Sequence, residues 1–283
     1  MLRIRKMRRG DISFAVRLSD QEDWAIPARD FERILRLDPR GSFIAMENGR
    51  RVGLTTTTSY GKQIAWIGNV VVEKSRRGKH IGQALVKHAI RYLQKTRVRR
   101  IVLYSFDENV AYYRKVGFIQ GPRFSRFRRE RQPLRHTASQ SAVSKAISVR
   151  ALLAMDRRAF GADRARLLVD MLNSGVASYL GYSIQSKASY LLAKAYEDMC
   201  ELGPWVSFNL RQAELESMLH LALKTAKSKP VEIACPLTNR KVLAILSKSH
   251  FHAIKQGHMM WYERLSKLGQ PNSVLAFGFL DKG

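Results

Sequence analysis

The sequence predicts an α/β fold of the α+β type, with a mixed sheet, built as two similar domains in tandem. Strand-like and helix-like spacings of apolar residues alternate along its 283 residues, which is enough chain for two domains of ordinary size. The second half repeats the order of elements found in the first. A stretch of different composition separates the halves, rich first in Arg and then in Ser, Ala and Gln.

The elements of the first half follow the order β-α-α-β-β-β-α-β-α-β. Alternating apolar and polar residues indicate strands, and apolar residues three and four apart indicate helices. Asp38-Pro39-Arg40-Gly41 ends one helix, because proline and glycine cannot continue it, and Asn48-Gly49 predicts a tight hairpin turn. The expected strands lie at 2–7, 42–47, 51–60, 63–72, 100–106 and from 118 onward, and the expected helices at 11–20, 29–38, 82–97 and 109–116.

The second half is expected to begin near residue 141. Part of the Arg-rich stretch 123–136 is assigned to a last strand of the first half. The predicted boundaries are therefore 1–136 for an N-terminal domain, 137–145 for a linker and 146–283 for a C-terminal domain. Its expected helices lie at 149–160, 162–173, 211–224 and 240–248, and its expected strands at 177–183, 188–196, 201–208, 231–236, 253–262 and near 273–279.

The charge of the chain is high and uneven. The formal net charge is +27. Residues 1–140 hold 31 Lys and Arg against 12 Asp and Glu, a net +19, and residues 141–283 hold the remaining +8. Such a field attracts anions, among them phosphorylated ligands and nucleic acid. A small anionic ligand does not require an excess of positive charge spread over a whole domain, so we keep nucleic acid as an alternative partner.

The composition also argues against several classes of protein. Apolar residues make up 45% of the chain and the mean hydropathy is −0.26, which fits a protein with real cores and no membrane span. The basic N-terminus is not followed by an apolar stretch, so no signal peptide is expected. Cys200 and Cys235 cannot form a disulfide framework and are expected to be buried, in a protein of the reducing cytoplasm.

The stretch most informative about function is a strand that runs through a basic, glycine-containing turn into a helix. The strand ends at Val72, and the turn carries Arg76, Arg77, Gly78 and Lys79 before the helix. A turn of this kind points backbone N–H groups at the start of a helix toward a bound anion. Glycine lets the main chain approach closely, and the basic side chains add positive charge. The turn therefore predicts a pyrophosphate site.

This turn resembles the acetyl-coenzyme A loop of the GNAT superfamily of N-acetyltransferases, which reads Gln/Arg-x-x-Gly-x-Gly/Ala. Arg77-Gly78-Lys79-His80-Ile81-Gly82 fits, except that His80 replaces the middle glycine. If His80 must adopt a positive φ it is strained, and its side chain would lie close to the cofactor phosphates. The segment Asn109–Phe118 is similar to the family's helix that carries a tyrosine four residues before Gly-Phe.

The resemblance implies the roles of these residues. Tyr113 would protonate the departing thiolate of coenzyme A, and Asn109 would lie near the pantetheine or adenosine end. The strand 67–72 would separate from its neighbour, so that the free N–H of Val70 or Val71 could bind the acetyl carbonyl and the oxyanion. Acetyl-CoA would be the acyl donor, attacked directly by the amine, with no metal. The implied donor contacts are Val70, Val71, Val72, Arg76, Arg77, Gly78, Lys79, His80, Ile81, Gly82 and Asn109.

Further segments resemble a GNAT subfamily with a second, degenerate GNAT-like domain. The second half has no turn of the same kind: Ser207–Glu214 contains no glycine and one basic residue, Arg211. His250 stands where the first half has the glycine of Gly-Phe, and no tyrosine precedes it suitably. The second half is therefore expected to bind no acetyl-CoA and to wall the acceptor site or maintain the architecture. The segments that carry this resemblance are Trp24, 38–43, 52–53, 65–68, 160–164, 202–206 and 277–283.

We therefore interpret the chain as an acetyl-CoA-dependent N-acetyltransferase whose acceptor is a small-molecule or peptide primary amine. The alternative is a nucleic-acid- or ribosome-associated basic binding protein on a GNAT scaffold. The sequence does not single out a general base: Glu22 and Asp23 are expected in a solvated loop, and water could serve. The stripe of Lys87, Arg91 and Lys95 is expected to be a solvated helix face that could touch nucleic acid. Core packing is expected for Trp24, Trp66 and Trp205, and no metal site for His250, His252 and His258.

Overall fold

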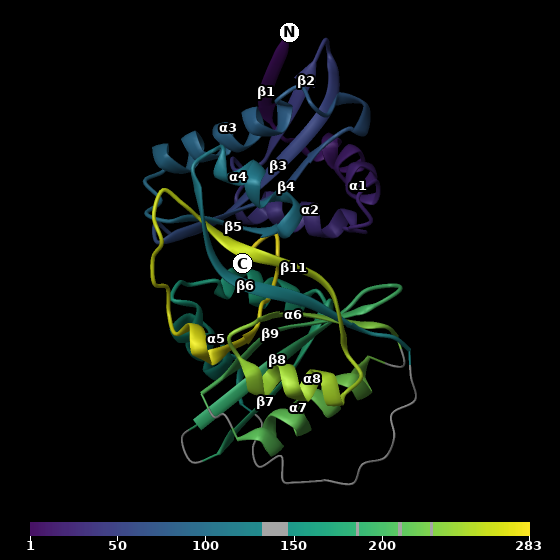
Figure 1. The fold of residues 1–283 in the computed structure, drawn as a ribbon, viewed down its shortest axis with the longest axis vertical. Helices are drawn as coiled ribbons and strands as arrows, with labels where there is room; N and C mark the ends of the chain where they lie inside the picture. Colours follow the sequence, from purple (N-terminus) through teal and green to yellow (C-terminus); the bar gives the residue numbers. More distant parts are fainter. Residues whose placement is uncertain (132–146, 185–186, 209–210, 227–228) are drawn as a thin grey trace.

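The computed structural model describes residues 1–131, 147–184, 187–208, 211–226 and 229–283. Within these residues, strands from both halves join one twelve-stranded mixed sheet, ordered β1-β2-β3-β4-β5-β11-β6-β10-β9-β8-β7, with β12 beside β9 (Figure 1). The strands are β1 (Leu2–Lys6), β2 (Phe43–Glu47), β3 (Arg50–Tyr60), β4 (Ile64–Val72), β5 (Ile101–Phe106), β6 (Phe118–Arg129), β7 (Ala177–Ile184), β8 (Lys187–Ala195), β9 (Cys200–Ser207), β10 (Val231–Pro236), β11 (His252–Tyr262) and β12 (Val274–Ala276).

The helices cover both faces of this sheet, which confirms the mixed α/β prediction. Short 3₁₀ turns precede α1, α3, α4 and β12. No helix in the described ranges is both long and apolar enough to cross a membrane. The helices are α1 (Ile12–Asp20), α2 (Ala28–Leu37), α3 (Ile81–Lys95), α4 (Val110–Arg114), α5 (Val149–Phe160), α6 (Ala165–Asn173), α7 (Gln212–Thr225) and α8 (Arg240–Lys248).

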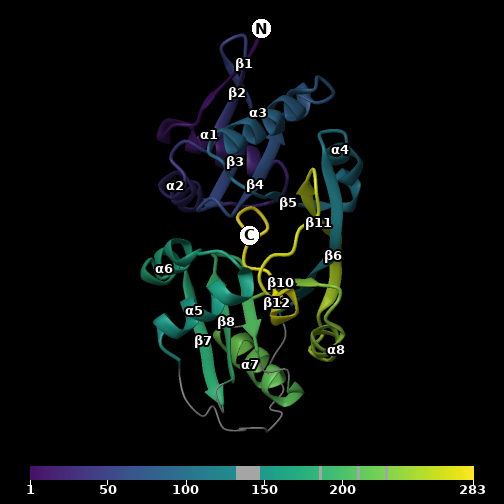
Figure 2. The same cartoon turned by 90° about the vertical axis from the view of Figure 1, so that its left-hand side faces the viewer.

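The two halves exchange one strand each at the centre of the sheet. In the first half β4 runs parallel to β5, and in the second half β9 runs parallel to β10. β11 of the second half pairs with β5, and β6 of the first half pairs with β10, while β6 and β11 pair with each other. Figures 1 and 2 show β6 and β11 side by side between the two halves. The unit strand–helix–strand–helix–strand therefore occurs twice, and neither unit completes its own sheet.

Most predicted elements lie where the sequence places them, and the differences have local causes. The helix expected from 162 begins at Ala165, because the Asp163 carboxylate accepts the Ala165 N–H at 2.9 Å and turns the chain first. The strand expected at 273–279 is only β12. Much of the Arg-rich stretch is strand β6, in which Arg126 and Arg128 pair with Glu232 on β10. The predicted linker 137–145 lies outside the described residues, and the domain boundaries remain a prediction.

The cores follow from the apolar faces of the elements. The predicted face of α3 is buried against the sheet, and it consists of Ile81, Leu85, Val86, Ala89, Ile90 and Leu93. The helices α1 and α2 pack against Leu54 and Val71 on the opposite face. Cys200 and Cys235 are buried and free, as expected. Trp66 and Trp205 are core residues with almost no exposed surface, which confirms that expectation for both.

A buried ion pair holds the start of α6 against α5. Arg164 and Asp156 lie 2.8 Å apart and each side chain is 2% exposed. The Tyr190 hydroxyl donates to the same carboxylate, and Arg164 also donates to the Gly283 carbonyl. Removing one member of such a pair leaves the other charge buried without a partner, which costs about 3–5 kcal/mol.

We therefore expect Arg164→Met to lower the free energy of unfolding by about 3–5 kcal/mol, measured by urea denaturation. Arg157→Met is the matched control, because its pair with Asp163 is 3.9 Å long and both side chains are exposed; it should change the same quantity by less than about 1 kcal/mol. Equal losses in the two variants would contradict the role given to the buried pair.

Candidate functional site

The site is built on the separation of two parallel strands. β4 pairs with β5 only at Ala65 and Trp66, opposite Ile101 and Val102. Beyond this point β4 follows β3 as far as Val72, whereas β5, whose other edge pairs with β11, no longer pairs with β4. The β4 edge from Ile67 to Val72 therefore has no strand partner on the β5 side among the described residues. The predicted separation of the strand 67–72 is confirmed.

A β-bulge redirects β4 inside this open stretch. Between the pairs Thr56/Gly68 and Leu54/Val71, β4 has one residue more than β3. Asn69 lies at the bulge with a φ of 50°, and its side-chain amide donates to the Thr56 hydroxyl at 3.0 Å. The bulge places the last residues of β4 in line with the turn that follows.

The basic turn has the conformation that an anion site requires. His80 is the N-cap of α3 and has φ 57° and ψ 12°, the left-handed region. Gly78 also has a positive φ, 81°, and no atom lies within 4 Å of a Cβ built on it. The Ala84 N–H is bonded to the His80 carbonyl, so the N–H groups of the helix residues before Ala84 have no partner within the helix.

Acidic partners hold the arginines of the turn. Arg77 pairs with Glu22, and its Nε–H donates to the Val72 carbonyl at 3.2 Å. Arg76 lies 3.2 Å from Glu47. Glu22 therefore contacts the turn, whereas the sequence predicts that it lies in a solvated loop. The loop before α2 folds back onto the turn and supplies that contact.

α4 carries two neighbouring tyrosines, of which Tyr112 faces the start of α3. A Cβ at Gly82 would lie 2.6 Å from the Tyr112 hydroxyl, so only glycine admits that ring. The Tyr112 hydroxyl is buried with no hydrogen-bond partner among the described residues. Tyr113 packs edge-on against Tyr112 and Phe118. Burial raises the pKa of Tyr112 to about 12 and also raises the pKa of Tyr113. Both phenols therefore keep their protons at neutral pH.

One cavity of about 1360 Å³ brings these parts together. Of the residues proposed from the sequence, only Lys79 is not part of its wall; it is exposed beside the turn. The cavity is lined by the proposed residues Val70, Val71, Val72, Arg76, Arg77, Gly78, His80, Ile81, Gly82, Asn109 and Tyr113.

The far wall of the cavity comes from the loop before α2 and from the second half of the chain. Trp24 lines it and is 37% exposed, so the expectation of core packing is wrong for Trp24. Although the chain carries a net charge of +27, many side chains of this wall are carboxylates. They are Asp20, Glu22, Asp30, Glu197, Asp198, Glu201, Glu232 and Asp281.

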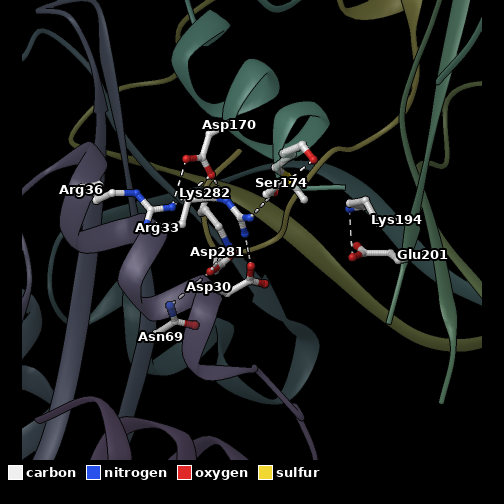
Figure 3. A network of polar contacts seen from close by, with 11 residues as sticks. Asp30, Arg33, Arg36, Asn69, Asp170, Ser174, Lys194, Glu201, Asp281 and Lys282 are labelled. Atoms are coloured by element: carbon white, nitrogen blue, oxygen red, sulfur yellow. Dashed lines mark hydrogen bonds and ion pairs between the residues drawn. The ribbon is translucent and has the colours of Figure 1, made fainter. Parts of the chain in front are cut away.

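The segment 277–283, which follows β12, reaches across to β4 (Figure 3). The Asn69 amide donates to the Asp281 carboxylate at 3.2 Å. The Tyr60 hydroxyl donates to the Lys282 carbonyl at 2.7 Å, and a Cβ at Gly68 would overlap the Asp281 backbone. No spacing in the sequence points to Asp281 or Lys282 as site residues, because their position depends on contacts between the two halves.

Other ion pairs lie around the same wall, and the one between Arg33 and Asp170 joins the two halves. Arg33 on α2 pairs with Asp30 and with Asp170 on α6. Lys194 on β8 lies 2.9 Å from Glu201 on β9 (Figure 3). These contacts fix α2 of the first half against the second half, so the cavity has walls from both.

The equivalent separation in the second half is filled by the chain itself. β9 and β10 pair from Cys200 to Leu202, and β12 then pairs with β9 at Trp205 and Val206. The Phe277 N–H donates to the Ala234 carbonyl of β10 at 2.8 Å. β12 therefore lies between the diverging strands and leaves no open edge comparable with that of β4.

The remaining polar residues noted in the sequence lie elsewhere. Lys87, Arg91 and Lys95 form an exposed face of α3, as expected. His258 contacts the Gln120 side chain at 2.8 Å and the Gly121 carbonyl at 3.0 Å. Within the described ranges no three His, Cys, Asp or Glu side chains are grouped so that they could hold a metal ion.

Comparison with family models and known sequences gives matches in both halves. The model of the acetyltransferase (GNAT) family matches residues 10–118, and an acetyltransferase (GNAT) domain model matches residues 152–274. Serotonin N-acetyltransferase 2, chloroplastic, of Oryza sativa subsp. japonica is 30% identical over 122 residues, 40% of this chain and 61% of the relative. An uncharacterized N-acetyltransferase of Methanocaldococcus jannaschii is 29% identical over 31% of this chain. The chain spans 61% and 43% of these relatives' lengths.

Solved structures share the whole architecture. A candidate acetyltransferase of Pyrococcus horikoshii superposes with a TM-score of 0.79 at 20% identity, over 100% of this chain and 96% of the other. A tandem GNAT protein from the clavulanic acid biosynthesis pathway gives a TM-score of 0.69 at 13% identity, over 94% of this chain and 100% of the other. At these identities the likeness shows the fold, and it confirms the tandem arrangement.

The conformation of His80 leads to a test of the turn. We expect His80→Val to lower the free energy of unfolding by about 1–2 kcal/mol, because a β-branched residue in the left-handed region is strained. His80→Gly should stay within about 1 kcal/mol of wild type, since relief of strain is offset by a more flexible unfolded chain. Urea denaturation measures both, and a His80→Val variant as stable as His80→Gly would contradict a left-handed N-cap.

Proposed function

From the premise that the chain belongs to the acetyltransferase (GNAT) family, with one domain in each half, we propose that its first half transfers an acetyl group from acetyl-CoA to a primary amine. One observation carries the proposal: the open edge of β4, the turn before α3 and Tyr113 line the same cavity. The sequence resemblance links the open edge to polarisation of the acetyl carbonyl, the turn to donor binding, and Tyr113 to protonation of the leaving group.

The turn is suited to the pyrophosphate of the donor. The free N–H groups at the start of α3 point positive partial charge at the cavity, and Arg76 and Arg77 stand beside them. A bound pyrophosphate would compete with Glu47 and Glu22 for these guanidinium groups. The pantetheine would run along Val70 to Val72, where an unpaired N–H could bind the acetyl oxygen and the oxyanion that develops on it.

Tyr113 is suited to act as the acid. The amine nitrogen attacks the thioester carbonyl carbon, a C–N bond forms and the C–S bond breaks. The leaving thiolate then takes a proton from the Tyr113 hydroxyl, which solvent replaces. Because burial raises the pKa of Tyr113, the phenol is protonated and ready to donate throughout the neutral range.

The wall opposite the turn supports an amine as acceptor. An amine is a cation at neutral pH, and the carboxylates of this wall attract cations in a protein that otherwise attracts anions. The second half takes part by supplying most of these carboxylates.

Titration with acetyl-CoA tests the donor site. We expect Gly82→Asp to weaken acetyl-CoA binding at least tenfold, about 1.4 kcal/mol, since the new side chain meets Tyr112 and puts a negative charge at the turn. Gly10→Asp adds the same charge in open space outside the cavity and should bind like wild type. Equal affinity of all three proteins, or no binding by wild type, would contradict the proposal.

Tyr113→Phe tests the acid. It should lower kcat by about 10²- to 10⁴-fold and leave the acetyl-CoA Kd within about twofold of wild type. Tyr112→Phe is the matched control: its hydroxyl faces Gly82, so its removal should affect donor affinity more than kcat. Steady-state rates and titration with acetyl-CoA separate the two, and an unchanged kcat in Tyr113→Phe would remove Tyr113 from the mechanism.

A further inference from the structure

We propose that Asp281 is the residue that binds the acceptor ammonium and takes its proton. The inference rests on the proposed acetyl transfer and names a base for it. The base would thus come from the segment 277–283, outside the half that carries the turn and Tyr113.

Asp281 is placed at the point where β4 opens. Its carboxylate accepts from the Asn69 amide at 3.2 Å, and Asn69 is the bulge residue of β4, next to Val70. The Asp281 backbone packs directly on Gly68, where no side chain would fit. The carboxylate is partly exposed, 19%, and lines the cavity that also contains Tyr113. It can therefore meet an amine that approaches the open edge of β4.

The segment that carries Asp281 is firmly held. The Tyr60 hydroxyl donates to the Lys282 carbonyl at 2.7 Å. The Gly283 N–H donates to the Phe279 carbonyl at 2.9 Å. Such anchoring fixes the carboxylate relative to β4, and proton transfer requires that kind of positioning.

Four other carboxylates of the cavity are already paired with cationic side chains. Glu22 pairs with Arg77, Asp30 with Arg33, and Glu232 with Arg126 and Arg128. Glu201 pairs with Lys194. A carboxylate held by a guanidinium fork has fewer lone pairs to offer a substrate. Asp281 accepts from the Asn69 amide and from the Lys282 ammonium, which lies 2.7 Å from both of its oxygens. Its contact with Asn69 places it against β4.

Asp281 is not the only acidic group that acts on Lys282. Burial lowers the pKa of Lys282, but Asp281, Asp30 and Glu201 together outweigh that effect and raise it. Asp281 is the largest of these acidic influences, and Asp30 and Glu201 remain beside Lys282 when Asp281 binds a second cation. The groups that face Asp281 are Lys282 in its own segment, Asp30 and Arg33 on α2, Asn69 on β4, Tyr60 on β3, Lys194 on β8, Tyr196 beyond β8 and Glu201 on β9.

The proposed step balances as follows. One N–H bond of the ammonium breaks, the proton goes to an Asp281 oxygen, and the nitrogen keeps the electron pair with which it attacks the thioester carbon. Asp281 later releases this proton to solvent. The second proton lost by the nitrogen leaves to solvent as the C–S bond breaks, and Tyr113 protonates the sulfur.

The test is the pH dependence of kcat/KM for an amine that wild type acetylates, found by screening monoamines, polyamines and basic peptides. Asp281→Asn should lower kcat/KM by at least about 100-fold at neutral pH. The kcat/KM of Asp281→Asn should keep rising with pH in the range in which the wild-type value no longer changes. Asp281→Glu should recover part of the rate. Glu130→Gln, which removes an exposed carboxylate outside the cavity, should behave as wild type.

A second measurement distinguishes a role of Asp281 as the base from a role only as the counter-ion of Lys282. In Asp281→Ala, added formate should restore part of the rate, because a small carboxylate can occupy the space and accept the proton. A structural role predicts a uniform loss at every pH, no rescue by formate and a lowered Tm; that set of results would overturn the inference.

The outcomes for the two proposals differ. If wild type binds and transfers acetyl groups while Asp281→Asn retains its kcat/KM across the pH range, the inference fails and the proposed function stands. If wild type neither binds acetyl-CoA nor acetylates any amine of the screen, the proposed function fails, and the inference fails with it. If wild type binds acetyl-CoA, Asp281→Asn should bind it with the same affinity.

Discussion

The separation of β4 from β5 after two paired residues is the constraint on which the rest of the site depends. It leaves strand backbone unpaired inside the protein, and such backbone requires a partner. The bulge at Asn69 and the turn through His80 continue the same path toward the start of α3. A ligand with a carbonyl group, an extended chain and a pyrophosphate would satisfy the strand, the bulge and the turn in that order.

The same separation occurs in the second half and is resolved differently. There β12 enters between β9 and β10, so the unpaired backbone is satisfied by the chain itself. The chain then continues through 277–283 to Gly68 and Asn69 of β4. One segment thus closes the second cleft and completes the wall of the first. Duplication followed by this division of roles accounts for one half with an open strand edge and a basic glycine turn, supported by another that carries no such turn.

Local sequence patterns made much of the fold and of the candidate site predictable. The parts that depend on contacts between the halves could not be predicted from the sequence. The face of α3, the Asn48-Gly49 hairpin and the strand-to-turn sequence before Gly82 depend on neighbours in the chain, and each lies where it was expected. The exchange of β6 and β11 depends on pairing between residues more than a hundred positions apart, and no periodicity reports such pairing. Trp24, Glu22 and Asp281 line the cavity for the same reason: loops and the segment 277–283 are positioned by distant partners.

The central claim is that the fold is duplicated while the donor site is single. The number of acetyl-CoA molecules bound per chain, measured by isothermal titration calorimetry on the full chain, tests it most directly. The account predicts a stoichiometry of one, because only β4 offers an open edge in the described residues and only the first half has the basic glycine turn. A stoichiometry of two, or heat from no site at all, would contradict it.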